Sequence, residues 1–223
     1  MNCLYRIWQI VLMNMVDLEI IYGFGCPLTV HRRCISPMFD ICNKIAYNSK
    51  MINRTKLPDK KVDLFFEKSA WIDIPGKEVS KKNHYVQEQG EVVLNIISDA
   101  LVLNKKLPDI FIISPFKSVV NEMKLALRKA LYRLLPTKRL IVEKWIEENV
   151  GTVHTFQGKE ANEVIFLLGC DESSIQAANW VGKSVNMLNV AASRAKYRFV
   201  VIGDLELWQN VSYFNEVICR MHN

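Results

Sequence analysis

Three short polar segments of this sequence carry the residue types best suited to chemistry. They read Ser114-Pro115-Phe116-Lys117, Thr-Val-His-Thr-Phe-Gln-Gly-Lys-Glu over residues 152–160, and Gly203-Asp204. Hydroxyl, amide and cationic side chains next to glycine are typical of sites that hold phosphate groups or nucleic acid. The three segments therefore predict a ligand that carries phosphate.

Each segment begins at the end of a predicted strand. We expect buried strands over residues 109–113, 150–154, 163–168 and 198–202, and a short strand over residues 70–74. Between them, amphipathic patterns predict helices. Strands that alternate with helices indicate an α/β fold, a doubly wound and mostly parallel sheet with helices on both faces. Ligands bind at the carboxyl ends of the strands in such sheets, so we expect the three segments along one edge.

Helices are predicted over residues 36–48 and 86–103, directly after Phe116, between the last two strands and at the C-terminus. For the first helix, Ser36 is expected to cap the N-terminus, with Pro37 at the first helical position. Its buried face would hold Met38, Ile41, Cys42 and Ile45. In the helix after Phe116, the expected core stripe is Val120, Met123, Leu127, Leu131 and Leu134.

The length and composition suit one domain. Half of the 223 residues are hydrophobic, which is ample for one core. We expect a helical lead-in over residues 1–22 and a domain over residues 23–223, with a small excursion over residues 49–85. The apolar run from Ile7 to Val16 is interrupted by Gln9 and Asn14, and nothing approaches the roughly 18 apolar residues of a membrane span. A cytoplasmic protein without a membrane partner is expected.

The charge balance indicates an anionic partner. The chain carries 29 Lys and Arg against 23 Asp and Glu, a net charge of +6. Residues 117–139 hold seven basic side chains and a single acid, Glu122. This stretch has two interpretations, a surface that contacts the phosphate backbone of a nucleic acid or an ordinary solvated helix face.

Cysteine spacing predicts no metal site. The six cysteines include no CxxC pair, and His31 does not complete a zinc-ligand spacing. We expect reduced thiols, most of them packed in the core.

A short Gly182-Lys183-Ser184 sequence is similar to the end of a phosphate-binding loop. That loop needs a glycine five residues before its Gly-Lys pair, where this chain has Ala177, and a strand that leads directly into it. We expect an exposed connection before the next helix.

Four segments carry a resemblance to superfamily 1 helicases. The sequence Gly-Thr-Val-His-Thr-Phe-Gln-Gly-Lys-Glu over residues 151–160 resembles motif V, and Leu-Asn-Val-Ala-Ala-Ser-Arg-Ala-Lys over residues 188–196 resembles motif VI. Residues 27–34, with Ile45-Ala46-Tyr47 and Lys50-Met51, look like the arginine-bearing segment of the up-frameshift-like branch, and residues 112–116 are similar to its motif IV region. The resemblance covers about residues 20–205 and identifies the chain as the second RecA-like domain of such a motor.

This resemblance implies a role in ATP hydrolysis between two RecA-like domains. Arg33 and Arg194 would act as arginine fingers on the γ-phosphate, because a permanently charged planar fork stabilises the charge that spreads over the phosphoryl oxygens. Glu160 would contact the nucleotide ribose, and Gln157 and Gly158 would form the turn that lets the backbone approach the ligands. By residue type alone, Arg33 would equally suit an ion pair with a surface carboxylate.

The resemblance also implies contacts with single-stranded DNA or RNA. His154 and Thr155 would lie on the nucleic-acid side of motif V. Ser114 and Lys117 would contact phosphates, and Phe116 would stack on a base. His154 and Phe116 also suit the core, where histidines and aromatic rings at strand ends are common.

The motor function would need a partner domain. ATP and Mg²⁺ would be shared with a first RecA-like domain that carries GxxxxGK[ST] and an acidic metal-binding motif, and this sequence contains neither. That domain would come from another polypeptide or from a longer parent chain, and the isolated chain is expected to be inactive. Two alternatives are a non-catalytic nucleic-acid-binding or assembly module, and an autonomous nucleotide hydrolase built on Lys183.

Overall fold

The computed structural model describes residues 29–57 and 62–221. Its centre is a five-stranded sheet with the order β3-β7-β6-β4-β5, in which every neighbouring pair is parallel. The strands are β3 (Ala70–Asp73), β4 (Ile110–Ser114), β5 (Val150–Thr152), β6 (Ala161–Leu167) and β7 (Ala195–Gly203). The predicted α/β fold is confirmed.

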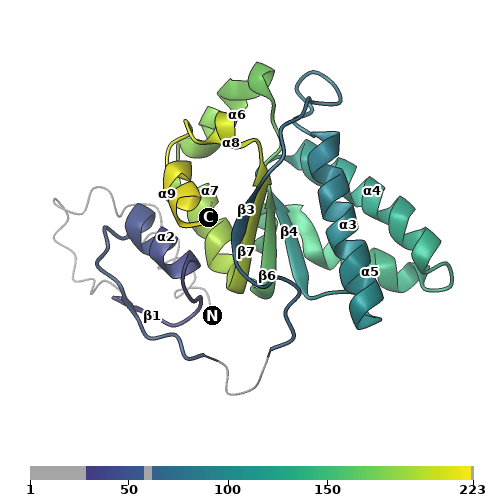
Figure 1. The fold of residues 1–223 in the computed structure, drawn as a ribbon, viewed down its shortest axis with the longest axis horizontal. Helices are drawn as coiled ribbons and strands as arrows, with labels where there is room; N and C mark the ends of the chain where they lie inside the picture. The colour runs from purple at the N-terminus through teal and green to yellow at the C-terminus, as the bar shows by residue number, and fades with distance from the viewer. Residues whose placement is uncertain (1–28, 58–61, 222–223) are drawn as a thin grey trace, which may run out of the picture.

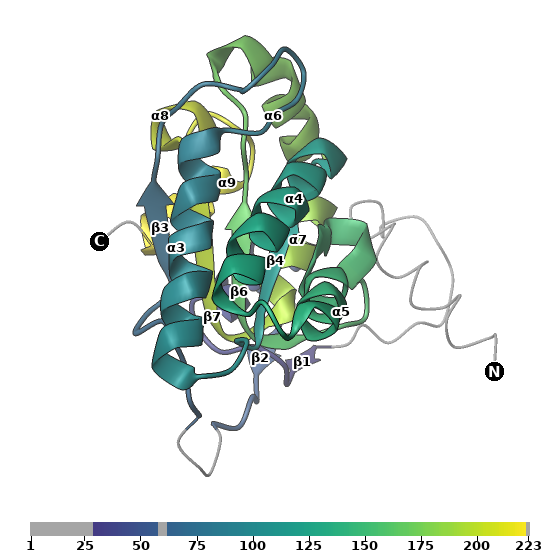
Figure 2. The same cartoon turned by 90° about the vertical axis from the view of Figure 1, so that its right-hand side faces the viewer.

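Helices cover both faces of the sheet (Figure 1). One face carries α3 (Gln87–Asn104), α4 (Lys117–Leu134) and α5 (Arg139–Asn149), which lie in front of the strands in Figure 2. The other face carries α2 (Met38–Ala46), α7 (Val185–Arg194) and α9 (Phe214–Met221). Two short helices, α6 (Ile175–Gly182) and α8 (Leu205–Trp208), lie towards the carboxyl ends of the strands. Because the sheet is covered on both faces, its central strands β4, β6 and β7 each contain an apolar run of four or more residues.

The core combines these strands with aromatic rings. All five residues of β4 are buried, as are the last five of β7. Phe166 on β6 stacks between Phe199 of β7 and Phe214 of α9, with ring centroids 6.0 and 6.4 Å away, and Trp208 lies 4.7 Å from Phe214. Burial of these rings stabilises the sheet and the packing of the C-terminal helix on it.

The start of α2 differs from the prediction. Pro37 precedes the helix instead of occupying its first position, and no side chain makes a capping hydrogen bond there, so the expected Ser36 cap is wrong. The helix ends at Ala46 because Asn48 and Ser49 take positive φ angles of 49° and 59°. The expected buried face is confirmed for its first three members, whereas Ile45 is half-buried.

The stretch after Phe116 holds two helices where one was predicted. The core stripe of α4 is confirmed except for Leu134, whose side chain is 47% exposed in the last turn. A tight connection over residues 135–138 then leads into α5. The short parallel pair formed by β1 (Val30–His31) and β2 (Ile52–Asn53) was also not predicted.

The predicted excursion over residues 49–85 is partly built into the main sheet. Its strand β3 pairs with β7, and the Glu163 carboxylate accepts hydrogen bonds from the backbone N–H groups of Phe65 and Phe66 at 2.9 and 2.8 Å. The predicted lead-in over residues 1–22 lies outside the described residues. Within the described part of the chain, no helix is both long and apolar enough to cross a membrane.

Candidate functional site

The three polar segments share one edge of the sheet only in part, because the segment over residues 152–160 ends at the opposite edge. Ser114 and Gly203 end their strands at the carboxyl edge. The segment over residues 152–160 begins there too, but it runs through the 3₁₀ turn η1 (Val153–Phe156) to the start of β6. Consecutive parallel strands need such a crossover between opposite edges. Glu160 therefore lies at the amino edge, where Ala161 pairs with Ala195.

At this amino edge, Glu160 lies between two cations. Its carboxylate is 2.7 Å from Lys196 Nζ on β7 and 3.6 Å from Arg33 Nε. The segment that carries Arg33 is held in place because the Ile35 N–H donates to the Lys196 carbonyl at 3.1 Å. The side chains of Arg33 and Glu160 are 38% and 42% exposed, so both are open to a ligand from solvent.

The pKa of Glu160 reflects these neighbours. The hydrogen bond from Lys196 lowers the pKa of this carboxyl below its usual value, and partial burial opposes the shift. The positive charges of Lys196, Arg33 and Arg194 lower it further. Glu160 is therefore a carboxylate near neutral pH, and it keeps the cationic side chains gathered at this edge.

Arg194, the second predicted arginine finger, is buried. It is only 6% exposed at the end of α7, and its Nη1 donates to the carbonyls of Lys159 and Phe156 at 2.9 and 3.3 Å. Nε donates to the Val190 carbonyl at 3.1 Å. Burial lowers the pKa of Arg194 to about 10, and the charge of Arg33 adds to this effect. In this conformation Arg194 holds the loop before β6 and does not extend into solvent.

The loop that Arg194 holds turns at Gly158. This glycine has a φ of +90°, which side chains with a Cβ rarely adopt, and an added Cβ would meet no atom within 4 Å. Gln157 and Glu160 are exposed on either side of it. The loop thus offers open backbone next to the Glu160 cluster, as a nucleotide-binding turn requires.

The predicted nucleic-acid residues divide into buried and exposed groups. Ser114 is 2% exposed and accepts a hydrogen bond from the Phe116 N–H at 3.3 Å. Phe116 is 7% exposed, and its ring lies 4.6 Å from the ring of His84. Neither side chain reaches solvent in this conformation, because both pack inside the carboxyl edge. Lys117 is exposed at the first position of α4.

His154 and Thr155 are both exposed on η1. They follow Thr152, which pairs with Ser114 of the neighbouring strand at the carboxyl edge. The Thr155 hydroxyl lies 3.1 Å from the Thr152 hydroxyl. Of the predicted nucleic-acid residues, Lys117, His154 and Thr155 therefore remain accessible.

The basic stretch over residues 117–139 is partly neutralised within the chain. Arg128 Nε lies 2.9 Å from a Glu143 oxygen, and Lys124 and Arg128 both pair with Glu147. These glutamates belong to α5, beyond the basic stretch in the sequence. These ion pairs favour the interpretation of this part of α4 as an ordinary solvated helix face, and they stabilise the packing of α4 on α5.

The Gly182-Lys183-Ser184 segment connects two helices. It lies between α6 and α7, and the Ser184 hydroxyl caps α7 by accepting from the Asn186 N–H at 3.3 Å. Gly182 is packed, since an added Cβ would come within 2.5 Å of the Val211 side chain. No strand leads into this segment, so it does not have the strand–loop–helix geometry of a phosphate-binding loop.

Trp180 is a further candidate contact residue that no sequence pattern indicated. This tryptophan on α6 is 54% exposed, and its ring centroid lies 6.4 Å from that of Phe116. His84, Phe116 and Trp180 thus form a row of rings that ends at the surface. The three residues are far apart in the sequence, so only the fold shows the row.

Comparisons with known proteins agree with these motifs. Residues 22–206 match the family described as AAA domain. An uncharacterized ATP-dependent helicase of Methanocaldococcus jannaschii is 25% identical over 214 residues, which cover 87% of this chain and 29% of that protein. The DNA polymerase alpha-associated DNA helicase A of Schizosaccharomyces pombe is 30% identical over 125 residues, which cover 56% of this chain and 16% of that protein.

The chain spans less than a third of the length of these curated relatives. The family match nevertheless covers most of the chain, including the Arg33, Glu160 and Arg194 segments. The chain therefore belongs to this AAA domain family, within the up-frameshift-like branch of the superfamily 1 helicases.

Proposed function

We propose that this chain is the second RecA-like motor domain of an ATP-dependent superfamily 1 helicase. The observation that carries the proposal is the amino-edge cluster of Arg33, Glu160 and Lys196, next to the loop held by Arg194. It combines exposed cations, a carboxylate and open backbone in one place. These are the groups needed to bind the phosphates and ribose of a nucleotide.

Arg33 is the arginine best placed to act on ATP. Its contact with Glu160 is long, 3.6 Å, and both side chains are about two-fifths exposed. Such exposed ion pairs contribute only about 0–1 kcal/mol, so Arg33 exchanges this partner for a phosphate at little cost. A guanidinium on the transferring phosphoryl group accelerates hydrolysis by about 10³ to 10⁵.

Arg194 stabilises the loop that carries Gly158 and Glu160. Its hydrogen bonds to the Phe156 and Lys159 carbonyls shape the turn around Gly158. To act as a second finger it would first have to release those carbonyls. In the conformation seen here, we therefore assign Arg194 the role of a positioning residue. To act as an arginine finger, it would have to rearrange when the two RecA-like domains close on ATP.

A single strand of nucleic acid would contact the opposite side of the domain, at the carboxyl edge of the sheet. Lys117, His154 and Thr155 supply exposed polar groups there, and Trp180 supplies an exposed ring. Cations bind the phosphate backbone with a salt-dependent affinity, and an exposed aromatic ring stacks on a base. Ser114 and Phe116 would act indirectly, by fixing the start of α4.

ATP and Mg²⁺ would be held together with a first RecA-like domain. The sequence has no GxxxxGK[ST], and Glu160 is already engaged by two cations. The first domain would therefore supply the phosphate-binding loop and the metal ligands. Binding of ATP across the interface would close the domains, and hydrolysis would release them, so that the grip on a strand alternates.

The test is ATP hydrolysis and strand binding by the purified chain. Hydrolysis is measured with and without single-stranded DNA and RNA, for the parent, Lys183→Ala and Arg33→Ala. We expect no turnover in any of them. Turnover that Lys183→Ala abolishes would establish an autonomous nucleotide hydrolase and overturn the proposal.

Strand binding is measured by fluorescence anisotropy with labelled oligonucleotides at several salt concentrations. We expect an affinity that falls with salt and that Lys117→Ala weakens. Lys144→Ala is the matched control, since this lysine is 76% exposed on α5. No binding at low salt, or equal losses in the two variants, would contradict the assignment of the strand surface.

A further inference from the structure

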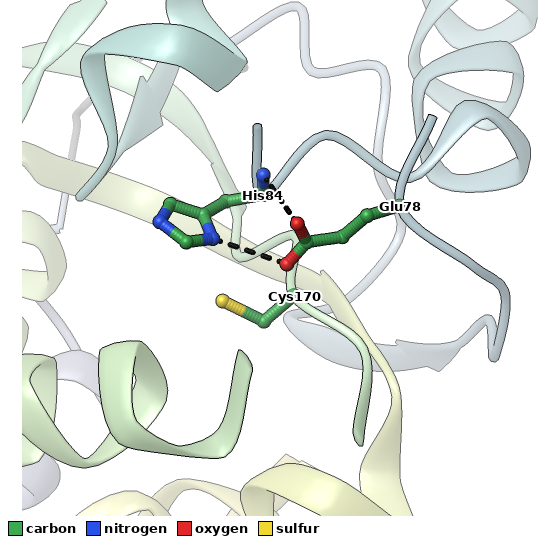
Figure 3. Close-up of side chains that lie close together, drawn as sticks. All are labelled: Glu78, His84 and Cys170. Atoms are coloured by element: carbon green, nitrogen blue, oxygen red, sulfur yellow. Dashed lines mark hydrogen bonds and ion pairs between the residues drawn. The ribbon is translucent and has the colours of Figure 1, made fainter. Parts of the chain in front are cut away.

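Three potential metal ligands from distant parts of the chain meet at the carboxyl edge. Glu78 and His84 lie in the connection between β3 and α3, and Cys170 follows β6 (Figure 3). One donor atom from each residue lies within 4.8 Å of the other two. Among the described residues, this is the one such group of three. It is separate from the amino-edge cluster, and the proposed motor function does not depend on a ligand bound here.

We propose that Glu78, His84 and Cys170 bind a divalent transition-metal ion of the zinc class. An imidazole nitrogen, a thiolate sulfur and a carboxylate oxygen are the three donor types that Zn²⁺ accepts. Mg²⁺ and Ca²⁺ prefer oxygen donors alone, so this set does not suit them. Three protein ligands leave a fourth position for water.

The donors are already close to a coordination geometry. His84 Nδ1 lies 3.0 Å from a Glu78 carboxylate oxygen, and the Cys170 side chain points towards this pair in Figure 3. Two ligands about 2.0 Å from a tetrahedral ion lie roughly 3.3 Å apart. An ion would thus replace the hydrogen bond between His84 and Glu78 with little movement of either side chain, while Cys170 closes on them.

The site is shielded from water. Cys170 is fully buried, the side chain of Glu78 is 2% exposed and that of His84 is 19% exposed. Burial keeps bulk water away from the three donors and strengthens ligand–metal electrostatics. The partial exposure of His84 leaves a route by which an ion enters.

The backbone holds these residues against a conformational cost. His84 and Cys170 have φ angles of 61° and 66°, in the left-handed region that residues with a Cβ disfavour by about 1 kcal/mol or more. The Cys170 N–H donates to the His84 carbonyl at 2.9 Å, and the His84 N–H donates to Glu78 at 3.0 Å. The fold thus aims both side chains inward from paired, strained positions.

The ion would tie together two parts of the carboxyl edge. It would link the connection before α3 to the end of β6, directly beneath Phe116, whose ring contacts His84 at 4.6 Å. Because Phe116 precedes α4, the site would stiffen the base of that helix. A purely structural alternative is a Glu78–His84 ion pair with an uninvolved thiol beside it.

Cobalt substitution distinguishes these two alternatives. The reduced, chelator-treated chain is titrated with Co²⁺, and the visible and near-ultraviolet spectra are recorded. We expect one ion per chain, intense tetrahedral bands and a thiolate-to-cobalt charge-transfer band, all displaced by Zn²⁺. A spectrum without a thiolate band would overturn the proposal.

Variants assign the bands to residues. Cys170→Ser should abolish the thiolate band, and His84→Gln should weaken binding by more than the roughly 10–100-fold typical of losing an outer-shell partner. Cys34→Ser is the matched control, because Cys34 Sγ lies 3.1 Å from a ring nitrogen of His31 and forms a second His–Cys pair. If the thiolate-to-cobalt band remains in Cys170→Ser and disappears in Cys34→Ser, the ion binds at the His31–Cys34 pair and the proposed site is wrong.

Zinc-edge X-ray absorption of the unmutated chain keeps the test independent of variant folding. We expect one sulfur at about 2.3 Å and nitrogen or oxygen ligands at about 2.0 Å. Oxygen ligands alone, or two or more sulfurs, would contradict the site. The motor proposal is unaffected by either result, since ATP hydrolysis and strand binding are measured separately.

Discussion

The amino and carboxyl edges of the same parallel sheet differ in how their polar groups are held. At the amino edge, Arg33, Glu160 and Lys196 contact one another near solvent, and the loop at Gly158 leaves space beside them. At the carboxyl edge, Glu78 and Cys170 are buried beneath a row of aromatic rings. The exposed side chains of the amino edge can exchange their ion-pair partners for a ligand, whereas the buried side chains of the carboxyl edge are fixed by packing.

Under the proposed function, this difference would let one domain serve two ligands. A nucleotide that binds and leaves in each cycle needs charged groups whose mutual contacts are weak, and exposed ion pairs have that property. A strand-binding surface needs a rigid platform, and buried rings and short hydrogen bonds supply it. Burial, more than residue type, therefore separates the two edges.

The largest change in stability is expected when a glycine is replaced by alanine at the carboxyl edge, and the same replacement at the amino edge gives the comparison. Gly169 and Gly158 have φ angles of +65° and +90°, but an added Cβ at Gly169 would lie 2.0 Å from the His84 carbonyl. Gly169→Ala should lower the free energy of unfolding by about 3 kcal/mol, through backbone strain plus this clash. Gly158→Ala should cost about 1 kcal/mol, from strain alone. Urea denaturation measures both, and equal losses would show that the carboxyl edge is not the more rigidly packed one.

The two arginines of the amino edge provide the next contrast. Arg194→Ala should lower the free energy of unfolding by about 2 kcal/mol, because the carbonyls of Phe156 and Lys159 lose their donor. Arg33→Ala should change it by less than about 0.5 kcal/mol, since the Arg33 side chain is 38% exposed. Chemical denaturation of both variants checks this. A large loss for Arg33→Ala would mean that the cluster is structural.

Strand binding should depend on the carboxyl edge alone. Trp180→Ala should weaken binding of single-stranded DNA or RNA about tenfold, because stacking on an aromatic ring contributes about 1–3 kcal/mol per base. Trp180→Phe should retain most of the affinity, and Arg33→Ala should leave it unchanged. Anisotropy titrations at one salt concentration measure all three. An equal loss in the two tryptophan variants would exclude stacking as the cause.

The smallest effect concerns pH. Contacts with Lys196 and Arg33 lower the pKa of Glu160 in the folded chain, so their stabilisation is present above the usual value of 4.5 and is lost as pH falls through the lowered pKa. Glu160→Gln should therefore reduce stability near neutral pH and have little effect in acid. Thermal unfolding of the parent and the variant from neutral to acid pH measures the difference in their stability, which high salt should diminish. A difference that grows in acid would reverse the expected sign.

Much of the fold could be predicted from residue patterns. The five strands were located to within a few residues because most of them contain an apolar run followed by polar residues. The exception is β5, with the sequence Val-Gly-Thr. The division of the stretch after Phe116 into α4 and α5 was missed, since a basic, amphipathic pattern continues across residues 135–138. The pairing of Lys124 and Arg128 with glutamates of α5 could not be predicted, because it depends on how the two helices pack.

The candidate site was predicted in part. The resemblance to superfamily 1 helicase motifs singled out Arg33, Gly158, Glu160 and Arg194, and the structure brings these residues together at the amino edge. The roles assigned to them remain predictions. The burial of Ser114 was not foreseen, because a residue after a strand faces solvent or core according to the helix that covers it. For Phe116, the structure supports the alternative of a core position.

By itself, the sequence determined the α/β class, the family and the residue types that suit a nucleotide and a strand. These follow from local patterns, because alternating strands and helices and short motifs are encoded by neighbouring residues. Only the tertiary structure decided which edge each group occupies, which arginine is exposed, and that Glu78, His84 and Cys170 meet. The physical reason is that burial and contact depend on chain segments far apart in sequence, which only packing brings together.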